Sequence, residues 1–128
     1  MASKRGASPS TRVAVVEDDD AIARLLRDLL SMEGFEVMIV SDGRTAAARV
    51  RLSHCRAVVL DRRLPGKDGI EIVRDLREDA ETEDLPVVML SAQSDDQSTW
   101  EAWKAGVNYY MNKPFDPKEL VRVLHQVT

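Results

Sequence analysis

Residues 58–69 read VVLDRRLPGKDG, and they are the most informative part of the sequence for the fold. A short apolar run ends directly in Asp61, and a loop rich in Gly, Pro and charged residues follows it. A carboxylate directly after a buried strand costs free energy unless a partner or a function offsets its charge. Because strands covered by helices on both faces read as continuous apolar runs, we expect a central parallel strand with a functional group at its end.

The chain on both sides of this strand repeats the same pattern. Short apolar runs alternate with longer segments of helical period, which is typical of βα units in a parallel sheet. Strands are expected over residues 13–16, 35–40, 57–60, 86–90 and 107–111. The sequence therefore predicts an α/β fold with five parallel strands.

Polar caps and glycine stops mark the helices between these strands. The acidic residues 18–20 precede an apolar series with helical spacing, so Asp19 or Asp20 is expected as the N-cap and Gly34 as the stop. Further helices are expected over 45–52, around 70–77, over 95–105, and from Asp116 with Pro117 at the first helical position.

Composition narrows the class of protein. The 128 residues suit one domain, 44% of them are hydrophobic, and the net charge is -4 with both signs interspersed. These values argue against direct nucleic-acid or membrane binding, and the Arg62-Arg63 pair is expected on a loop surface. The single Cys55 excludes an internal disulfide and favours the cytoplasm. Residues 1–11 are expected to be a disordered arm, neither signal peptide nor anchor, and residues 12–128 a single domain.

Five polar residues follow the predicted strands. Parallel strands present their carboxyl ends at one sheet edge, where α/β folds bind ligands. The residues at that edge are Glu17, Asp18, Asp61, Ser91 and Lys113. Crowded carboxylates repel one another unless a cation lies among them, and hard oxygen ligands suit Mg²⁺. Asp61 could then accept a phosphoryl group, with Lys113 and Ser91 contacting its oxygens.

Four motifs in order now point to a family. The chain resembles response-regulator receiver domains in the order and spacing of four motifs, which are VAVVEDDD, VVLDRRLPGKDG, VVMLSA and YYMNKPF. The resemblance spans about residues 12–127. Each motif is common alone, but together with five βα units they are specific. The resemblance implies a flavodoxin-like, doubly wound five-stranded parallel sheet of order 2-1-3-4-5 with five helices.

The resemblance also implies a role for each residue at the edge. Asp61 would be the phosphoacceptor, and the other roles are metal-site acids (Glu17, Asp18), a metal-binding backbone carbonyl (Arg63), a phosphoryl contact beside a cis peptide (Lys113, Pro114) and a switch pair (Ser91, Tyr110). The implied ion is Mg²⁺, with Mn²⁺ as a substitute. Such domains receive phosphate from a histidine kinase or a phosphotransfer protein.

The implied output is conformational. The surface of the fourth helix, fifth strand and fifth helix would change and contact an output partner or a second copy of the domain. The sequence departs from the commonest family pattern: Glu17 replaces Asp, Ser91 replaces Thr, and Arg63 and Gln93 occupy positions that influence loss of the phosphoryl group.

Isolated aromatic, histidine and cysteine residues have simpler interpretations. Trp100 and Trp103 lie three apart on the fourth helix, so we expect one in the core and the other on the output surface. His54, His125 and Cys55 lack ligand-like spacing and are expected to be structural or surface residues.

Two other functions compete with the phosphorylated switch. A metal-dependent phosphatase would also use an aspartyl phosphate, but the commonest such family has a second Asp where this chain has Arg63. An interaction domain that has lost the chemistry would not need the five polar residues. We therefore expect a signalling switch that catalyses only its own phosphorylation and dephosphorylation.

Overall fold

The computed structural model describes residues 11–93 and 95–128, so the arm expected over residues 1–11 lies outside the described residues apart from Thr11. Strands and helices alternate along the chain. Their bounds are β1 Arg12–Val16, α1 Asp20–Met32, β2 Glu36–Val40, α2 Gly43–Ser53, β3 Ala57–Asp61, α3 Gly69–Glu78, β4 Val87–Ser91, α4 Asp96–Ala105, β5 Tyr109–Asn112 and α5 Pro117–Val127. None of the helices in the described ranges is long and apolar enough to cross a membrane.

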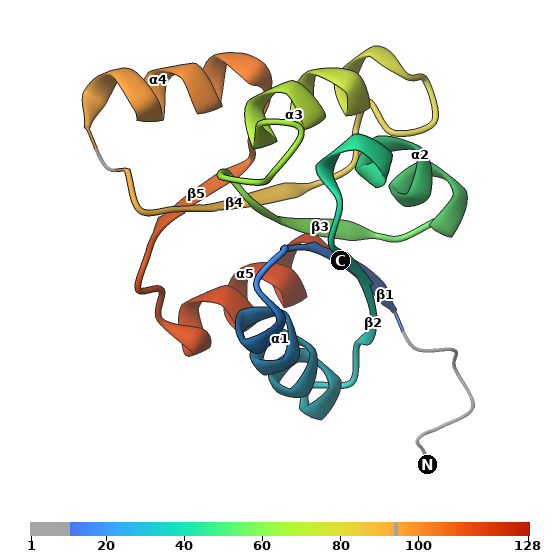
Figure 1. Cartoon of the computed structure of the whole chain (residues 1–128). Helices are drawn as coiled ribbons and strands as arrows, with labels where there is room; N and C mark the ends of the chain where they lie inside the picture. The colour runs from blue at the N-terminus through green and yellow to red at the C-terminus, as the bar shows by residue number, and fades with distance from the viewer. Residues whose placement is uncertain (1–10, 94) are drawn as a thin grey trace.

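The five strands form one parallel sheet in the order β2-β1-β3-β4-β5. Helices cover both faces: α2, α3 and α4 lie on one side, and α1 and α5 lie on the other (Figure 1). The fold class predicted from the sequence is confirmed.

Two hydrophobic cores lie between the sheet and its helices. Along β3 the side chains alternate, so that Val58 and Leu60 face α2 and α3 while Ala57 and Val59 face α1 and α5. This explains why β3 reads as an unbroken apolar run, since both of its faces are buried.

Local signals set most element boundaries as expected. Asp19 is the N-cap of α1 and accepts hydrogen bonds from the backbone N–H groups of Ala21 and Ile22. Gly106 ends α4 with a φ of 110°, which favours glycine. The fifth strand starts two residues later than predicted, because its register pairing with β4 begins at Tyr109, opposite Val88.

The expectation that one tryptophan enters the core is wrong. Trp100 and Trp103 are 62% and 45% exposed. The buried residues of α4 are Ser98, Ala102 and Ala105, spaced four and three apart along one helical stripe. Both indoles therefore lie outside the stripe that faces the sheet.

The expectation that the Arg62-Arg63 pair lies on the surface is wrong for Arg62, which is only 6% exposed. Arg62 follows Asp61 at the end of β3, where the alternation of β3 directs position 62 toward the face that carries Val58 and Leu60. Its guanidinium donates hydrogen bonds to the Ser98 carbonyl and the Glu101 carboxylate of α4. Arg63 is exposed, as expected.

The remaining isolated residues have structural or surface positions. Cys55 is buried, and burial raises the pKa of its thiol. His54 is exposed at the end of α2 with a φ of 55°. The exposed His125 ring lies 4.8 Å from the ring of Phe35, centre to centre.

Two methionines test the placement of the core. Met89 is fully buried on β4, whereas Met32 is 85% exposed at the end of α1. Met89→Ala is expected to lower the free energy of unfolding by about 2–5 kcal/mol, because it removes buried apolar atoms and leaves a cavity. Met32→Ala should change it by less than about 0.5 kcal/mol. Urea denaturation of both variants measures the difference, and equal losses would contradict this core.

Candidate functional site

The side chains that the sequence predicts to be functional gather beyond the carboxyl ends of the strands. Asp61 and Ser91 are the last residues of β3 and β4, while Glu17 directly follows β1 and Lys113 directly follows β5. The parallel sheet therefore brings residues far apart in sequence to one edge. The order of connection reverses between β1 and β3, which is the point where doubly wound sheets bind ligands.

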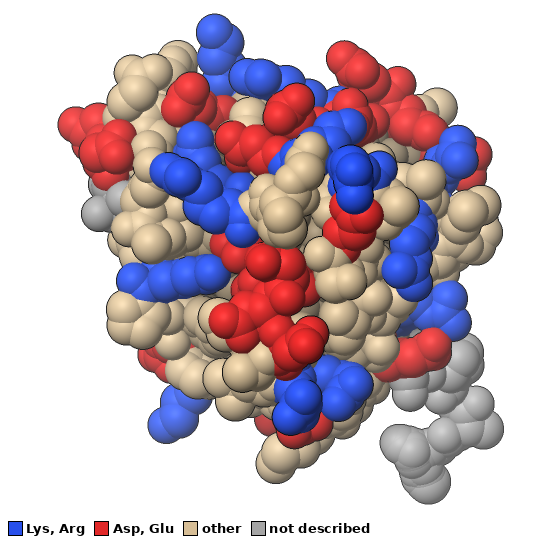
Figure 2. All heavy atoms as spheres, viewed as in Figure 1, with Lys and Arg blue, Asp and Glu red and all other residues tan. Residues whose placement is uncertain are grey.

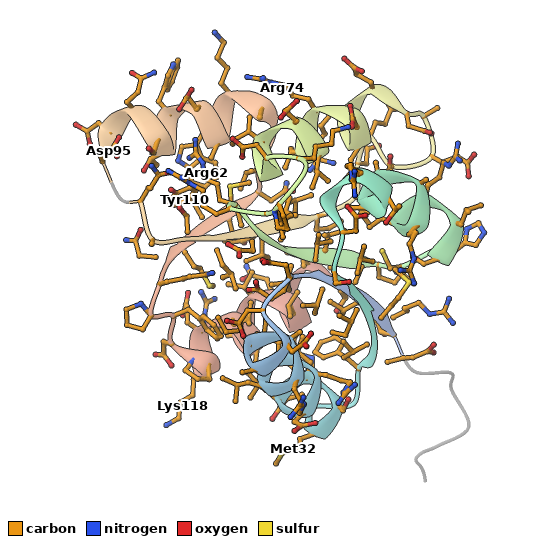
Figure 3. The ribbon with its side chains drawn as sticks, in the orientation of Figure 1. Met32, Arg62, Arg74, Asp95, Tyr110 and Lys118 are labelled. Carbon is orange, nitrogen blue, oxygen red and sulfur yellow. The ribbon has the colours of Figure 1, made fainter. Side chains whose placement is uncertain are left out.

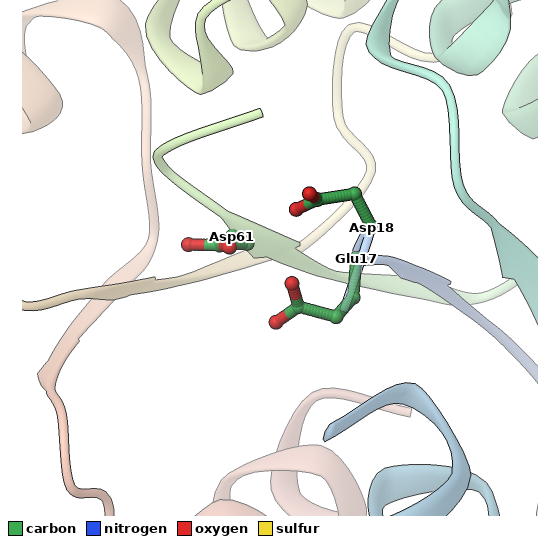
Figure 4. A group of neighbouring side chains, drawn as sticks. All are labelled: Glu17, Asp18 and Asp61. Carbon is green, nitrogen blue, oxygen red and sulfur yellow. The ribbon is translucent and has the colours of Figure 1, made fainter. Parts of the chain in front are cut away.

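Three carboxylates converge at this edge. Oxygen atoms of Glu17, Asp18 and Asp61 lie within 4.8 Å of one another. Figure 4 shows their carboxylates extending into the same space beyond the strand ends. Glu17 and Asp61 are buried and Asp18 is exposed, so the cluster opens to solvent on one side. Acidic atoms also gather at the middle of this face of the molecule (Figure 2).

Lys113 is the cation nearest to this cluster in the described part of the chain. Its Nζ lies 3.0 Å from Asp61 Oδ1 and 3.7 Å from Glu17 Oε1. The peptide bond between Lys113 and Pro114 is cis. The backbone N–H of Arg63 donates to Asp61 Oδ1 at 3.3 Å. One ammonium therefore faces two buried carboxylates, which leaves the cluster with excess negative charge.

The electrostatics of Glu17 favour a bound cation. Burial, with the nearby Asp61 carboxyl, raises the pKa of Glu17 to about 7, although Lys113 opposes the shift. Glu17 Oε1 is buried and has no hydrogen-bond partner among the described residues. A buried oxygen without a donor is costly, and a divalent cation would satisfy it. The residues present therefore fit a Mg²⁺ site.

Ser91 and Tyr110 meet at the backbone of Gln93. The Gln93 N–H donates to Ser91 Oγ at 3.0 Å, and the Tyr110 hydroxyl donates to the Gln93 carbonyl. Ser91 is buried, and its carbonyl accepts the Lys113 N–H at 2.8 Å. These contacts join the predicted switch residues to one another and to the lysine of the acidic site.

The sequence analysis missed two residues beside the site. A Cβ on Gly69 would lie 2.9 Å from both the Asp61 carbonyl oxygen and the Arg62 Cα, so only glycine lets the start of α3 approach the end of β3. The glycine in PGKDG could have indicated this close approach. The sequence analysis placed Arg62 on a loop surface. Its burial becomes visible only in the structure, where its N–H pairs with the Leu90 carbonyl of β4.

Comparison with known proteins identifies the family. The family model for the response regulator receiver domain matches residues 13–125. The chain belongs to this family. The matched range covers β2 to β5 in full, β1 from its second residue, and most of α5.

Relatives of this receiver domain include longer regulators. It is 40% identical over 110 residues to the DNA-binding response regulator MtrA of Mycobacterium tuberculosis, covering 86% of this chain and 47% of MtrA. It is equally similar to the phosphate regulon transcriptional regulatory protein PhoB of Rhizobium meliloti, covering 86% of this chain and 48% of PhoB. The chain spans about half the length of these curated relatives.

Solved structures agree with the fold of the receiver domain. A putative response regulator from Chloroflexus aurantiacus matches with a TM-score of 0.87 at 33% identity, covering 93% of this chain and 98% of that one. The receiver domain of sensor histidine kinase PA1611 from Pseudomonas aeruginosa, whose active-site cleft coordinates a magnesium ion, matches with a TM-score of 0.85 at 28% identity, with the same coverage.

The raised pKa of Glu17 predicts how stability depends on pH without metal. Between the ordinary value of 4.5 and about 7, the folded state holds a proton that the unfolded state has released. Stability should therefore fall as pH rises through this range, by about 1–3 kcal/mol. Denaturation in EDTA from pH 5 to 8 measures this loss, and Glu17→Gln should reduce it. An unchanged pH dependence in the variant would show that Glu17 is not its source.

Proposed function

We propose that this receiver domain is a phosphorylation switch in which Asp61 accepts a phosphoryl group from a phosphohistidine donor in the presence of Mg²⁺. The observation that carries the proposal is the convergence of three carboxylates and one lysine at a single sheet edge. Membership of the receiver-domain family supports the same function.

Each residue at the edge has a chemical task in this proposal. An Asp61 oxygen attacks phosphorus; the bond from phosphorus to that oxygen forms as the bond to the donor breaks, and the leaving group keeps the electron pair. Glu17, Asp18, Asp61 and the Arg63 carbonyl would hold Mg²⁺. When bound, the ion neutralises charge on the transferring group. Mn²⁺ is proposed as a substitute because it also prefers oxygen ligands.

Lys113 and Ser91 act on the phosphoryl oxygens. Lys113 Nζ is 3.0 Å from Asp61 Oδ1, so it is placed to contact an oxygen of a phosphoryl group bound to that carboxylate. The Ser91 hydroxyl, which accepts a backbone N–H here, can rotate to donate. Moving Ser91 toward the phosphoryl group would disturb the Gln93 backbone, which Tyr110 also contacts.

The partners follow from this chemistry. The phosphoryl donor is proposed to be a histidine kinase or a phosphotransfer protein, and the output an effector or a second copy that contacts the surface of α4, β5 and α5. The longer relatives are named as DNA-binding and transcriptional regulators, which supports a role in controlling an output domain. By the same likeness to response regulators, we propose that this receiver domain acts in the cytoplasm.

Acetyl phosphate tests the acceptor. With Mg²⁺ the domain is expected to gain one acid-labile phosphoryl group by intact mass, and Asp61→Asn should abolish the gain. The control is Asp84→Asn, which changes an exposed carboxylate on the loop before β4, at the opposite sheet edge. Phosphorylation that persists in Asp61→Asn would refute the assignment. Repeated turnover of a phosphate ester would instead indicate a phosphatase.

Lys113→Gln separates metal binding from phosphoryl transfer. Removing the ammonium relieves its repulsion of Mg²⁺, so the ion is expected to bind more tightly. Phosphorylation should nevertheless slow by roughly 10²-fold, because one charged contact to the transferring group is lost. Calorimetric Mg²⁺ titration and timed mass spectra measure the two effects. A variant that keeps the wild-type phosphorylation rate would exclude Lys113 from the transfer step.

A further inference from the structure

Hydrophobic burial holds α4 less firmly than α1, α3 and α5, each of which buries at least one leucine side chain. The buried residues of α4 are Ser98, Ala102 and Ala105, which offer little apolar area. By contrast, α1 buries Leu26 and Leu30. Because hydrophobic stabilisation scales with buried apolar area, polar contacts supply a larger share of what holds α4 in place.

Arg62 supplies two polar contacts within the first six residues of α4. Its Nη1 donates to the Ser98 carbonyl at 2.8 Å, and its Nη2 donates to the Glu101 carboxylate at 3.2 Å. Figure 3 shows Arg62 beneath α4, between that helix and the sheet. A buried guanidinium must be paired, so moving α4 away would leave a charged group without its partners.

The backbone of Arg62 is fixed to the phosphoacceptor edge. Its N–H donates to the Leu90 carbonyl at 2.9 Å, and its carbonyl accepts the Gly69 N–H at 2.8 Å. The next residue, Arg63, donates its N–H to the Asp61 carboxylate. Arg62 therefore lies between Asp61, the proposed acceptor, and Arg63, whose N–H contacts the Asp61 carboxylate.

The other end of α4 is held by a different arginine. Arg77 on α3 donates to the Gly106 carbonyl from Nε at 3.1 Å and from Nη2 at 2.8 Å. Its other hydrogen bonds go to the backbone of Thr82 and Glu83 and to the Asn108 side chain. This second contact is thus independent of the acidic site, and only the Arg62 end of α4 adjoins Asp61.

We propose that Arg62 is a positioning residue that fixes the first half of α4 and couples the state of Asp61 to the surface that carries Trp100 and Trp103. The coupling rests on the proposed function of Asp61. Phosphorylation converts the Asp61 carboxylate into an acyl phosphate, a mixed anhydride, which removes the carboxylate charge and so weakens it as the acceptor of the Arg63 N–H. The resulting backbone change reaches α4 through the two guanidinium hydrogen bonds.

Amide hydrogen exchange without a phosphodonor tests the positioning role. Arg62→Met keeps an apolar stem but removes the charge and both donors, and Arg74→Met at an exposed position of α3 is the matched control. Amides of residues 96–105 are expected to exchange at least about tenfold faster in Arg62→Met, while those of α1 and α5 keep wild-type rates. Wild-type protection of α4, or equal acceleration in every helix, would overturn the proposal.

Should Arg62→Met not fold, Arg62→Lys provides the same test. A single ammonium cannot bond to both the Ser98 carbonyl and the Glu101 carboxylate as the guanidinium does. Amide exchange should therefore accelerate in α4 alone, but by a smaller factor than in Arg62→Met. Unchanged α4 rates in Arg62→Lys would overturn the proposal equally.

Tryptophan emission tests the coupling, because both tryptophans of the chain lie on α4. Intact mass and emission are followed in the same samples with acetyl phosphate and Mg²⁺. The wild type should change its emission on phosphorylation, whereas Arg62→Met should be phosphorylated with that change lost. An emission change equal to wild type in phosphorylated Arg62→Met, or none in phosphorylated wild type, would overturn the coupling. Absence of phosphorylation in the wild type would refute the proposed function. The positioning role of Arg62 would then be tested by the hydrogen-exchange experiment, which needs no phosphodonor.

Discussion

The charge balance at one sheet edge is the constraint on which the structure depends. The parallel sheet brings together the buried carboxylates of Glu17 and Asp61, and the single ammonium of Lys113 lies 3.0 Å from one and 3.7 Å from the other. Repulsion between the carboxylates would favour separation, but the two hydrophobic cores hold the strand ends in place. Burial, together with the nearby Asp61 carboxyl, raises the pKa of Glu17, and Glu17 Oε1 has no hydrogen-bond partner within the described ranges.

The same edge is connected to the upper layer of helices by polar contacts. Ser91 and Tyr110 meet at the backbone of Gln93, just before α4, and Arg62 contacts α4 itself. These contacts all lie on the sheet face that α3 and α4 cover. Since α4 buries only small side chains, a change in a few hydrogen bonds can compete with the forces that position it.

Large side chains are distributed unevenly over the helices. Leucine fixes α1 and α5 to the lower face, where Leu26, Leu30, Leu120 and Leu124 are almost fully buried. On α4 the two tryptophans face outward. The largest apolar groups of that helix are therefore available for recognition and do not contribute to the core.

The order of strands and helices, the family, and the five polar residues at the strand ends could all be predicted from the amino-acid sequence. These features depend on local periodicity, caps and motif spacing, which the chain carries without reference to its neighbours. The buried face of α4 could not be predicted in this way, because both Trp100 and Ala102 are suited to a helix interface and the packing of α4 on the sheet selects between them. The burial of Arg62 also becomes visible only in the tertiary structure: an arginine in a loop sequence looks solvated, and the α4 acceptors that satisfy its charge lie more than 30 residues away.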